Sequence, residues 1–358
     1  MELCYTQLKF DLLEAIGQEG KNSTVYKAFD SQLNENLIVK KISKKAINED
    51  YNNTDESNFF NESRLLNDVK HPNVMPIKYA SEDEQYIYIS MPYYKNGSLN
   101  NLLNKKFLTV KEIIKYSLEF LSGVHYIHTK GLIHFDIKPT NIMIDDNNKA
   151  VITDFGLAKY IDSYGLARPN KLYNLHMPPE VNKYTDFSNK ADIYQSGITL
   201  YRMCNGNKVF HSMFKYWNTK GQARQAITEG NFPNRKFYLP HIPIKLRKII
   251  NKALNINVDE RYETILDMIN EISSIEIDAN WIYNTKENNC LQRWYTFNKK
   301  GTHFDTIELV NKGSGIYDVY GKRIRLNDND VARIRNWDLI NVKITDAFKK
   351  IETIIKNY

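Results

Sequence analysis

The segment HFDIKPTN, residues 134–141, places an acid, a base and an amide at fixed intervals around a proline. Asp136 could accept the proton of a hydroxyl group or orient that hydroxyl for attack, and Lys138 could neutralise charge on a phosphoryl group in transfer. The amide oxygen of Asn141 is a ligand of the kind that Mg²⁺ binds. These three side chains could therefore serve a phosphoryl transfer.

A second acid follows eighteen residues after Asp136, in the sequence TDFG. This residue, Asp154, comes directly after AVIT, a run that is typical of a short strand. Carboxylate and amide oxygens are hard ligands, so Asp154 and Asn141 together could hold a magnesium ion that bridges the phosphates of ATP. Two short motifs at this separation are much more specific than either alone.

Two features nearer the N-terminus could bind the nucleotide. IGQEGKNSTVYKA, residues 16–28, is a glycine-containing turn whose backbone amides could approach a polyphosphate, although an ordinary hairpin is the better interpretation of this loop taken alone. Lys40, in LIVKK, could hold the α and β phosphates if Glu62 of FFNESRLL fixed its flexible side chain. Without further context, solvent-exposed charge is the better interpretation of both residues.

The elements that must position these residues divide into a β-rich first part and a helical second part. Apolar and β-branched runs predict strands over 10–16, 25–29, 37–42 and 86–91, with one helix at about 56–69. From Ser98 the spacing becomes helical. Helices are predicted at LNNLLNKKF, at VKEIIKYSLEFLSGVHYIHTKG with Gly131 as the stop, and around 189–204, 244–254 and 262–275.

Beyond about residue 276 the pattern changes to hairpins. WYTF, TIELV and GIYDVYGKRIRL alternate apolar and polar residues around the turn signals NKKG, NKGSG and YGK, and the amphipathic segment ITDAFKKIETIIKNY follows. We therefore predict a separate small α+β domain over 279–358 that serves recognition or regulation and could bind a regulatory partner. A nucleic-acid partner is also conceivable for this basic, tryptophan-containing region, but aromatic residues at strand spacing are more often core.

Composition and charge limit the class of protein. The 358 residues are 42% apolar and 25% charged, which is typical of a folded globular chain. No run approaches the roughly 18 apolar residues of a membrane span, and three widely spaced cysteines suggest neither a disulfide framework nor a zinc site, so we expect a cytoplasmic protein without a membrane partner. Most of the basic excess lies in residues 280–358, which carry 14 Lys and Arg against 9 Asp and Glu.

Taken together, the motifs resemble the eukaryotic-type (Hanks-type) serine/threonine protein kinase superfamily over roughly residues 10–275. The resemblance is carried, in order, by IGQEGKNSTVY, VKK, the glutamate in NESRLL, HPNV, HFDIKPTN, TDFGLAK, MPPE, KADIYQSG and DERY. It implies an α+β bilobal fold, with a small N-lobe over 1–94 and a helical C-lobe over 95–278. It also implies ATP and Mg²⁺ as cofactors and protein substrates with Ser or Thr acceptors.

The resemblance implies particular roles for residues at matching positions. Asp136 would be the catalytic base and Lys138 the phosphate-contacting lysine, while Asn141 and Asp154 would bind the metal. The residues that would hold the nucleotide come from the glycine loop, the next strand, the helix and the hinge: Gly17, Gly20, Ser23, Val25, Lys40, Glu62, Met91, Pro92, Tyr93 and Tyr94.

Three further positions would be structural. Glu180 of MPPE and Arg261 of DERY match a buried ion pair, and Asp192 matches the aspartate that anchors the catalytic loop.

The basic residue Lys138 in DIKPTN is similar to that of serine/threonine kinases, whereas tyrosine kinases usually place it elsewhere in the loop. Small-molecule phosphotransferases typically lack this lysine and are a less favoured assignment.

The chain also departs from the family pattern. Ser23 occupies the last glycine position of a loop that is one residue longer than usual, and Tyr173 stands where serine/threonine kinases usually have threonine. Phe135 replaces an arginine that usually pairs with a phosphate on the activation segment, which corresponds to residues 154–180 here. We therefore expect activity that does not require a phosphate on that segment, with a non-catalytic, kinase-like binding module as the alternative. Ser163, Tyr164 and Tyr173 are conceivable phosphorylation sites, but ordinary exposed hydroxyls are the favoured interpretation.

Overall fold

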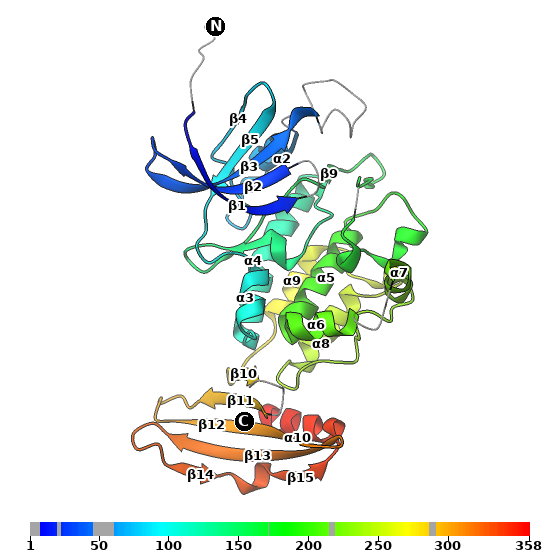
Figure 1. Cartoon of the computed structure of the whole chain (residues 1–358). Coiled ribbons are helices and arrows are strands. Elements are labelled where there is room, and N and C mark those ends of the chain that lie inside the picture. The colour runs from blue at the N-terminus through cyan, green and yellow to red at the C-terminus, as the bar shows by residue number, and fades with distance from the viewer. Residues whose placement is uncertain (1–7, 20–22, 46–60, 171, 215–218, 286–290) are drawn as a thin grey trace.

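The computed structural model describes residues 8–19, 23–45, 61–170, 172–214, 219–285 and 291–358. It shows a strand-rich lobe, a helical lobe and a second sheet at the opposite end of the molecule from the first (Figure 1). The predicted α+β class, with a β-rich small lobe before a helical large lobe, is confirmed.

The small lobe is an antiparallel five-stranded sheet with the order β1-β2-β3-β5-β4. Its strands are β1 Asp11–Glu19, β2 Ser23–Asp30, β3 Glu35–Ser43, β4 Tyr79–Glu82 and β5 Tyr86–Pro92. The four predicted strands are present, but β4 was missed because YASE has neither an apolar run nor a β-branched residue. Helix α2, Asn61–Asp68, covers most of the helix predicted at about 56–69, and residues 56–60 lie outside the described ranges.

The large lobe is built from helices around the central pair α4 and α5. Its helices are α3 Leu99–Lys105, α4 Val110–Thr129, α5 Lys190–Asn205, α6 Asn207–Phe214, α7 Lys220–Thr228, α8 Ile244–Ala253 and α9 Ile265–Ser273. A capping box between Thr109 and Glu112 begins α4, and Gly131, with a φ of +72°, follows its end as predicted. None of the helices in the described ranges is long and apolar enough to cross a membrane.

Two small strand pairs frame the segments that carry the acids. Strand β6, Leu132–Ile133, pairs with β9, Lys159–Tyr160, and β7, Ile142–Ile144, pairs with β8, Ala150–Ile152. The HFDIKPTN segment therefore lies between β6 and β7, and TDFG lies between β8 and β9. Because these strands pair with one another, the two segments are held side by side.

The C-terminal region forms a six-stranded sheet against one helix. The strands are β10 Ile282–Thr285, β11 Leu291–Phe297, β12 His303–Gly313, β13 Ile316–Arg325, β14 Val331–Arg333 and β15 Leu339–Val342, followed by helix α10, Ile344–Lys356. The order is β10-β11-β12-β13-β14, with β15 also paired to β13. The turns predicted at NKKG and NKGSG join β11 to β12 and β12 to β13.

The turn predicted at YGK is wrong, because that sequence lies within the continuous strand β13. Gly321 is paired there with Ile307 of β12. A Cβ atom on Gly321 would lie 2.5 Å from the Cβ of Trp337 and 2.8 Å from the carbonyl oxygen of Ile334. The glycine therefore allows a neighbouring segment to pack closely against the sheet, which is the other common use of glycine in a strand.

The C-terminal sheet packs directly on the helical lobe, and the two share one continuous apolar core. Trp294 of β11 is fully buried, and its indole Nε1 donates to Nδ1 of His241, 3.1 Å away. The ring of Tyr283 stacks on His241 at 5.6 Å and meets Phe107 edge-on at 4.6 Å. Trp281 is also buried, so these aromatic rings form core, as favoured from the sequence, and the boundary near residue 279 stays a prediction.

The buried interface residue His241 gives an expected pH dependence of stability. Burial, aided by the nearby charge of Arg247, lowers the pKa of His241 from 6.5 to about 3. Between these two pH values the unfolded chain binds a proton on His241 that the folded chain excludes. The free energy of unfolding is therefore unaffected by this group well above pH 6.5 and falls as the pH drops below 6.5. The test is His241→Asn, because the asparagine amide can still accept the hydrogen bond from Trp294. In urea titrations, the free energy of unfolding of this variant should fall by about 1.4 kcal/mol less than that of the wild type between pH 7.5 and 5.5. Equal losses would contradict this assignment.

Candidate active site

The backbone of residues 134–137, in the HFDIKPTN segment, is held by buried side chains from α5. Asp192, fully buried, accepts hydrogen bonds from the backbone N–H of His134 and of Phe135, each at 2.8 Å. Burial by itself would raise the pKa of Asp192, but the hydrogen bond and charge of His128, whose Nε2 lies 2.7 Å away, keep it lowered. The anchoring role predicted for Asp192 is therefore confirmed.

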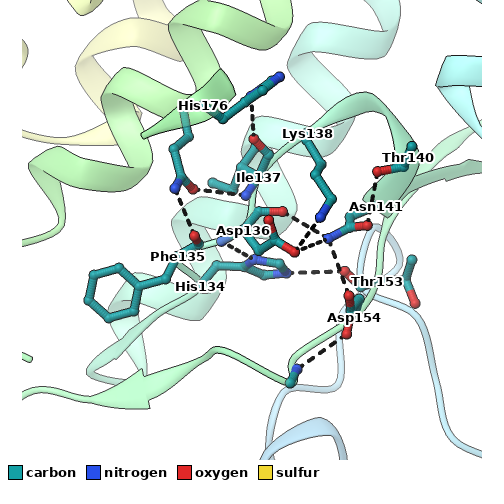
Figure 2. A network of polar contacts seen from close by, with 12 residues as sticks. His134, Phe135, Asp136, Ile137, Lys138, Thr140, Asn141, Thr153, Asp154 and His176 are labelled. Atoms are coloured by element: carbon teal, nitrogen blue, oxygen red, sulfur yellow. Dashed lines mark hydrogen bonds and ion pairs between the residues drawn. The ribbon is translucent and has the colours of Figure 1, made fainter. Parts of the chain in front are cut away.

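Gln195 and His176 also fix this segment, and the sequence analysis assigned neither of them a role. The Gln195 side chain accepts from the N–H of Ile137 at 2.8 Å and donates to the carbonyl of Phe135 at 2.7 Å. His176 Nδ1 lies 3.0 Å from the carbonyl oxygen of Ile137 (Figure 2). A signal for Gln195 was present, because it follows Asp192 by three residues and so shares its helix face.

The two oxygens of the Asp136 carboxylate have different surroundings. Oδ2 accepts from Lys138 Nζ at 2.7 Å and from Asn141 Nδ2 at 2.8 Å (Figure 2). Oδ1 is buried and has no hydrogen-bond partner among the residues that the structure describes. A buried polar atom without a partner is costly, and such atoms in native proteins often mark function. One oxygen is thus fixed in place while the other remains available to accept a hydroxyl proton.

Asn141 and Asp154 lie next to one another beside this carboxylate. Asn141 Nδ2 is 3.4 Å from Asp154 Oδ2 (Figure 2). Burial by itself would raise the pKa of Asp154, but the charge and hydrogen bond of Lys40, with smaller contributions from His134 and Lys138, lower it. An ionised carboxylate and an amide oxygen are hard donors, and they suit a Mg²⁺ ion whose other ligands are water and phosphate oxygens.

Lys40 approaches this pair from β3 of the small lobe. Its Nζ lies 3.1 Å from Asp154 Oδ1, and both side chains are largely buried. The lysine therefore connects the small lobe with Asp154 of the large lobe. The predicted contact between Lys40 and Glu62 is not tested, because the side chain of Glu62, in α2, lies outside the description.

Four of the remaining residues predicted to bind nucleotide belong to one apolar cluster, together with residues that the sequence analysis did not assign. Met91 is buried with Ile38, Met75 and Val151, and this cluster is covered in part by Val25, Tyr93, Tyr94 and Met143. Pro92 ends β5, directly after Met91. Apolar side chains from a strand above and from Val151 and Met143 below could enclose a flat ring.

The glycine loop is only partly described. Gly17, in β1, is paired with Val25, and a Cβ atom there would meet nothing within 4 Å. Ser23 begins β2, whereas Gly20 lies outside the described residues. Gly17 therefore borders open space beside the strand that leads to Val25.

Phe135 is fully buried and does not face the Asp136 carboxylate (Figure 2). It packs with Ala167 of the activation segment and with Phe187 and Ala191, and its ring meets that of Phe187 edge-on at 6.3 Å. Ala167 and Phe187 also exchange two backbone hydrogen bonds of 2.9 Å. The activation segment is thus held by apolar packing and a strand-like bridge at the position where the family usually has an arginine.

Tyr173 contacts Lys138 of the HFDIKPTN segment through its ring. Lys138 Nζ lies 4.5 Å from the centre of that ring, within the range of a cation–π contact. In the described part of the chain, the Tyr173 hydroxyl makes no hydrogen bond to Asp136 or Lys138. The contact that Tyr173 makes with Lys138 is therefore made by the face of its ring.

The predicted buried ion pair is confirmed. Arg261 donates from Nη1 and Nη2 to the two carboxylate oxygens of Glu180, at 2.9 and 2.6 Å. Both side chains are buried. The pair connects the end of the activation segment, at Glu180, with the segment that leads into α9.

Comparisons with known proteins agree with this geometry. The family model described as "Protein kinase domain" matches residues 10–272. A probable serine/threonine-protein kinase of Clostridium perfringens is 28% identical over 285 residues, which are 78% of this chain and 40% of the relative. The serine/threonine-protein kinase PrkC of Bacillus subtilis is 28% identical over 275 residues, 74% of this chain and 40% of PrkC. The chain spans about two fifths of the length of these relatives, and it belongs to the protein kinase family.

Proposed function

We propose that the chain is an active serine/threonine protein kinase that transfers the γ-phosphate of ATP to a protein hydroxyl. The observation that carries this proposal is the Asp136 carboxylate, with Oδ2 fixed by Lys138 and Asn141 and Oδ1 buried without a partner in the described residues. The relatives are named serine/threonine-protein kinases, which supports the same activity.

In the proposed reaction, the acceptor hydroxyl donates its hydrogen bond to Asp136 Oδ1. Its oxygen forms a bond to the γ-phosphorus as the bond from that phosphorus to the β–γ bridging oxygen breaks, and ADP leaves. The hydroxyl proton passes to Asp136. Lys138, beside the same carboxylate, neutralises charge on the phosphoryl group as it moves.

The neighbouring residues would bind the nucleotide and its metal. Asn141 and Asp154 would hold Mg²⁺, which when bound neutralises charge on the phosphates. Lys40 would contact the α and β phosphates from above. The apolar cluster around Met91 would enclose adenine, together with the hinge and glycine-loop residues: Gly17, Gly20, Ser23, Val25, Pro92, Tyr93 and Tyr94.

The proposed acceptor class, serine or threonine, rests on the position of Lys138 in DIKPTN and on the names of the relatives. The Lys138 ammonium group contacts both the Tyr173 ring and the Asp136 carboxylate. A tyrosine in place of the usual threonine is therefore compatible with the ion pair between Lys138 and Asp136. A regulatory partner of the C-terminal region and a cytoplasmic location stay predictions from the sequence.

The activity is tested with purified protein, labelled ATP, Mg²⁺ and a generic basic protein, with Asp136→Ala as the comparison. We expect Mg²⁺-dependent incorporation by the wild type, and hydrolysis of the product should yield phosphoserine or phosphothreonine. Incorporation no greater than that of Asp136→Ala, with autophosphorylation also absent, would overturn the proposal. Nucleotide binding without transfer would then support the alternative of a non-catalytic binding module.

We also propose that activity does not depend on phosphorylation of the activation segment. The support is Phe135, which is buried in the apolar cluster with Ala167, Phe187 and Ala191 and so holds the segment without a phosphate. An arginine at this position would need a phosphate or carboxylate partner to compensate for burial of its charge.

Removing the exposed hydroxyls of the activation segment should therefore leave kcat within about twofold of the wild type, as for ordinary surface changes. The variants are Ser163→Ala, Tyr164→Phe and Tyr173→Phe, the last of which keeps the ring beside Lys138. Steady-state rates with protein treated beforehand with a phosphatase provide the measurement. If the phosphatase-treated wild type were inactive and regained its rate only after phosphorylation, the proposal would be contradicted.

In contrast, Phe135→Ala should lower the free energy of unfolding by about 3–5 kcal/mol and reduce activity, because it empties the buried cluster.

A further inference from the structure

A cavity of about 870 Å³ opens in the C-terminal region, far from Asp136, and the activity proposed above does not use it. It is lined by the end of β13, by β14, by the 3-10 helix η7 (Arg335–Trp337) and by α10. A volume of this size suits a small ligand or a few residues of a peptide.

The lining carries more positive than negative charge. Four cations, Arg323, Arg333, Arg335 and Lys350, face a single side-chain carboxylate, that of Asp305. An anionic ligand is therefore favoured over a neutral or cationic one.

The carboxylates near the cavity are already engaged. Asp305 is fully buried, accepts from Nε and Nη2 of Arg323 at 2.7 Å each, and also accepts from the hydroxyl of Tyr358 at 3.1 Å. Asp338 accepts from Arg333 Nε at 2.6 Å. These contacts fix two guanidinium groups in orientation and leave part of each free, which is an arrangement suited to binding an anion.

Arg335 and Lys350 have no carboxylate partner in the described part of the chain. Lys350 Nζ donates to the carbonyl of Asn336 at 2.8 Å, which holds the ammonium group beside η7. The other arginines described over residues 291–358 all form ion pairs: Arg293, Arg323, Arg325 and Arg333. Arg335 is thus the one arginine of this region whose charge is not balanced, and it lies in the cavity wall.

The aromatic residues of the wall distinguish between anionic ligands. Trp337 packs edge-on against Tyr358 with ring centres 6.1 Å apart, and Tyr358 packs in the same way on Trp281 at 5.1 Å. Rings engaged edge to face in this manner serve as packing and do not present a row of free faces for stacked bases. A compact phosphate fits this wall better than a nucleic-acid strand does.

We propose that this cavity binds a phosphate monoester carried by a protein segment, namely a phosphoserine or phosphothreonine side chain. Arg335 and Lys350 contact the phosphate, and Arg323 and Arg333 add oriented donors. The proposal rests on the proposed kinase activity only for the origin of the phosphate, since the binding itself needs no catalysis. The C-terminal region would then retain phosphorylated proteins close to the kinase lobes.

The test measures binding of a labelled, degenerate peptide mixture with one central phosphoserine by fluorescence anisotropy, without ATP or Mg²⁺. The full chain is used with any tag at its N-terminus, because Tyr358 lines the cavity. The same mixture with serine in place of phosphoserine is the ligand control. Inorganic pyrophosphate and a single-stranded oligonucleotide serve as competitors, to separate recognition of a phosphopeptide from binding of a free anion or of nucleic acid.

We expect the phosphorylated mixture to bind at least about tenfold more tightly than the serine mixture, and Arg335→Glu and Lys350→Glu each to remove about tenfold or more of that affinity. Lys299→Glu makes the same charge change on the exposed turn between β11 and β12, outside the lining, and should stay within about twofold of the wild type. Transfer to the generic basic protein should be unchanged in all three variants, and thermal melting confirms that they fold.

Three results would overturn the proposal. These are no preference for the phosphorylated mixture, equal losses in the cavity variants and in Lys299→Glu, or competition by pyrophosphate or by the oligonucleotide that is stronger than competition by phosphoserine peptide. A kinase assay without activity would leave the binding result intact, so failure of the proposed function and failure of this inference are distinguishable.

Discussion

Replacing Asp136 by asparagine should lower kcat by about 10²–10⁴-fold while the affinity for ATP changes little. The reason lies in the two carboxylate oxygens. Lys138 and Asn141 both donate to the Oδ2 position, so the amide of asparagine must place its oxygen there. Its NH₂ group then occupies the Oδ1 position, where it presents a donor to a hydroxyl that also needs to donate.

The measurement compares steady-state kcat with nucleotide binding by calorimetry in the same preparations. Asp259→Asn makes the same chemical change at an exposed position of the large lobe and should keep the wild-type kcat. A kcat for Asp136→Asn within tenfold of the wild type would show that Asp136 does not accept the proton. A parallel loss of ATP affinity would show that the substitution disturbed the nucleotide site instead.

The sequence was sufficient to predict the parts of the site in which the chemistry is local. Asp136, Lys138 and Asn141 occupy one short segment, and the run AVIT predicted the strand that places Asp154 beside them. The β3 strand that carries Lys40 was equally plain, because ENLIVKKIS is apolar and β-branched. Patterns of this kind are readable because each depends on residues within one turn or one strand.

Contacts between distant segments were less accessible. His176 supports Ile137 from a position 39 residues away, and nothing in the local sequence of either residue indicates the other. Gly321 was misread as a turn because its use is set by Trp337, which packs against the strand from another segment. Similarly, β-strand spacing predicted that Trp294 is core but could not show that the core belongs jointly to the C-terminal sheet and the helical lobe.

Phe135 combines both situations. Its sequence position alone indicated that a phosphate-binding arginine was missing, but the replacement contact became visible only in the fold, where Ala167 and Phe187 close over the ring. Phe135 also has a φ of +64°, a backbone conformation that is unfavourable for a bulky residue. Two hydrogen bonds hold that conformation in place: the N–H of Phe135 donates to Asp192, and the side chain of Gln195 donates to the carbonyl of Phe135. The apolar cluster and the polar anchor therefore act on the same residue.

Removing one partner of the Glu180–Arg261 pair should lower the free energy of unfolding by about 3–5 kcal/mol, because it leaves the other partner charged and buried. The Arg261 side chain is fully buried, and besides Glu180 it donates to the carbonyl oxygens of Asn255 and Lys190, at 2.8 and 3.0 Å. Glu180→Ala leaves that guanidinium without a carboxylate. Arg261→Met leaves the Glu180 carboxylate without its cation.

The double variant separates the interaction from the other effects of each substitution. Glu180→Ala with Arg261→Met has no buried charge left at this site, so its loss of stability should be smaller than the sum of the two single losses by about 1–3 kcal/mol. Urea unfolding of all four proteins at pH 7.5, followed by circular dichroism, gives the coupling energy. Strict additivity would show that the two side chains contribute independently and that their close contact stabilises little. Because the pair fixes the end of the activation segment, we expect kcat of each single variant to fall along with stability, and the double variant to recover part of both.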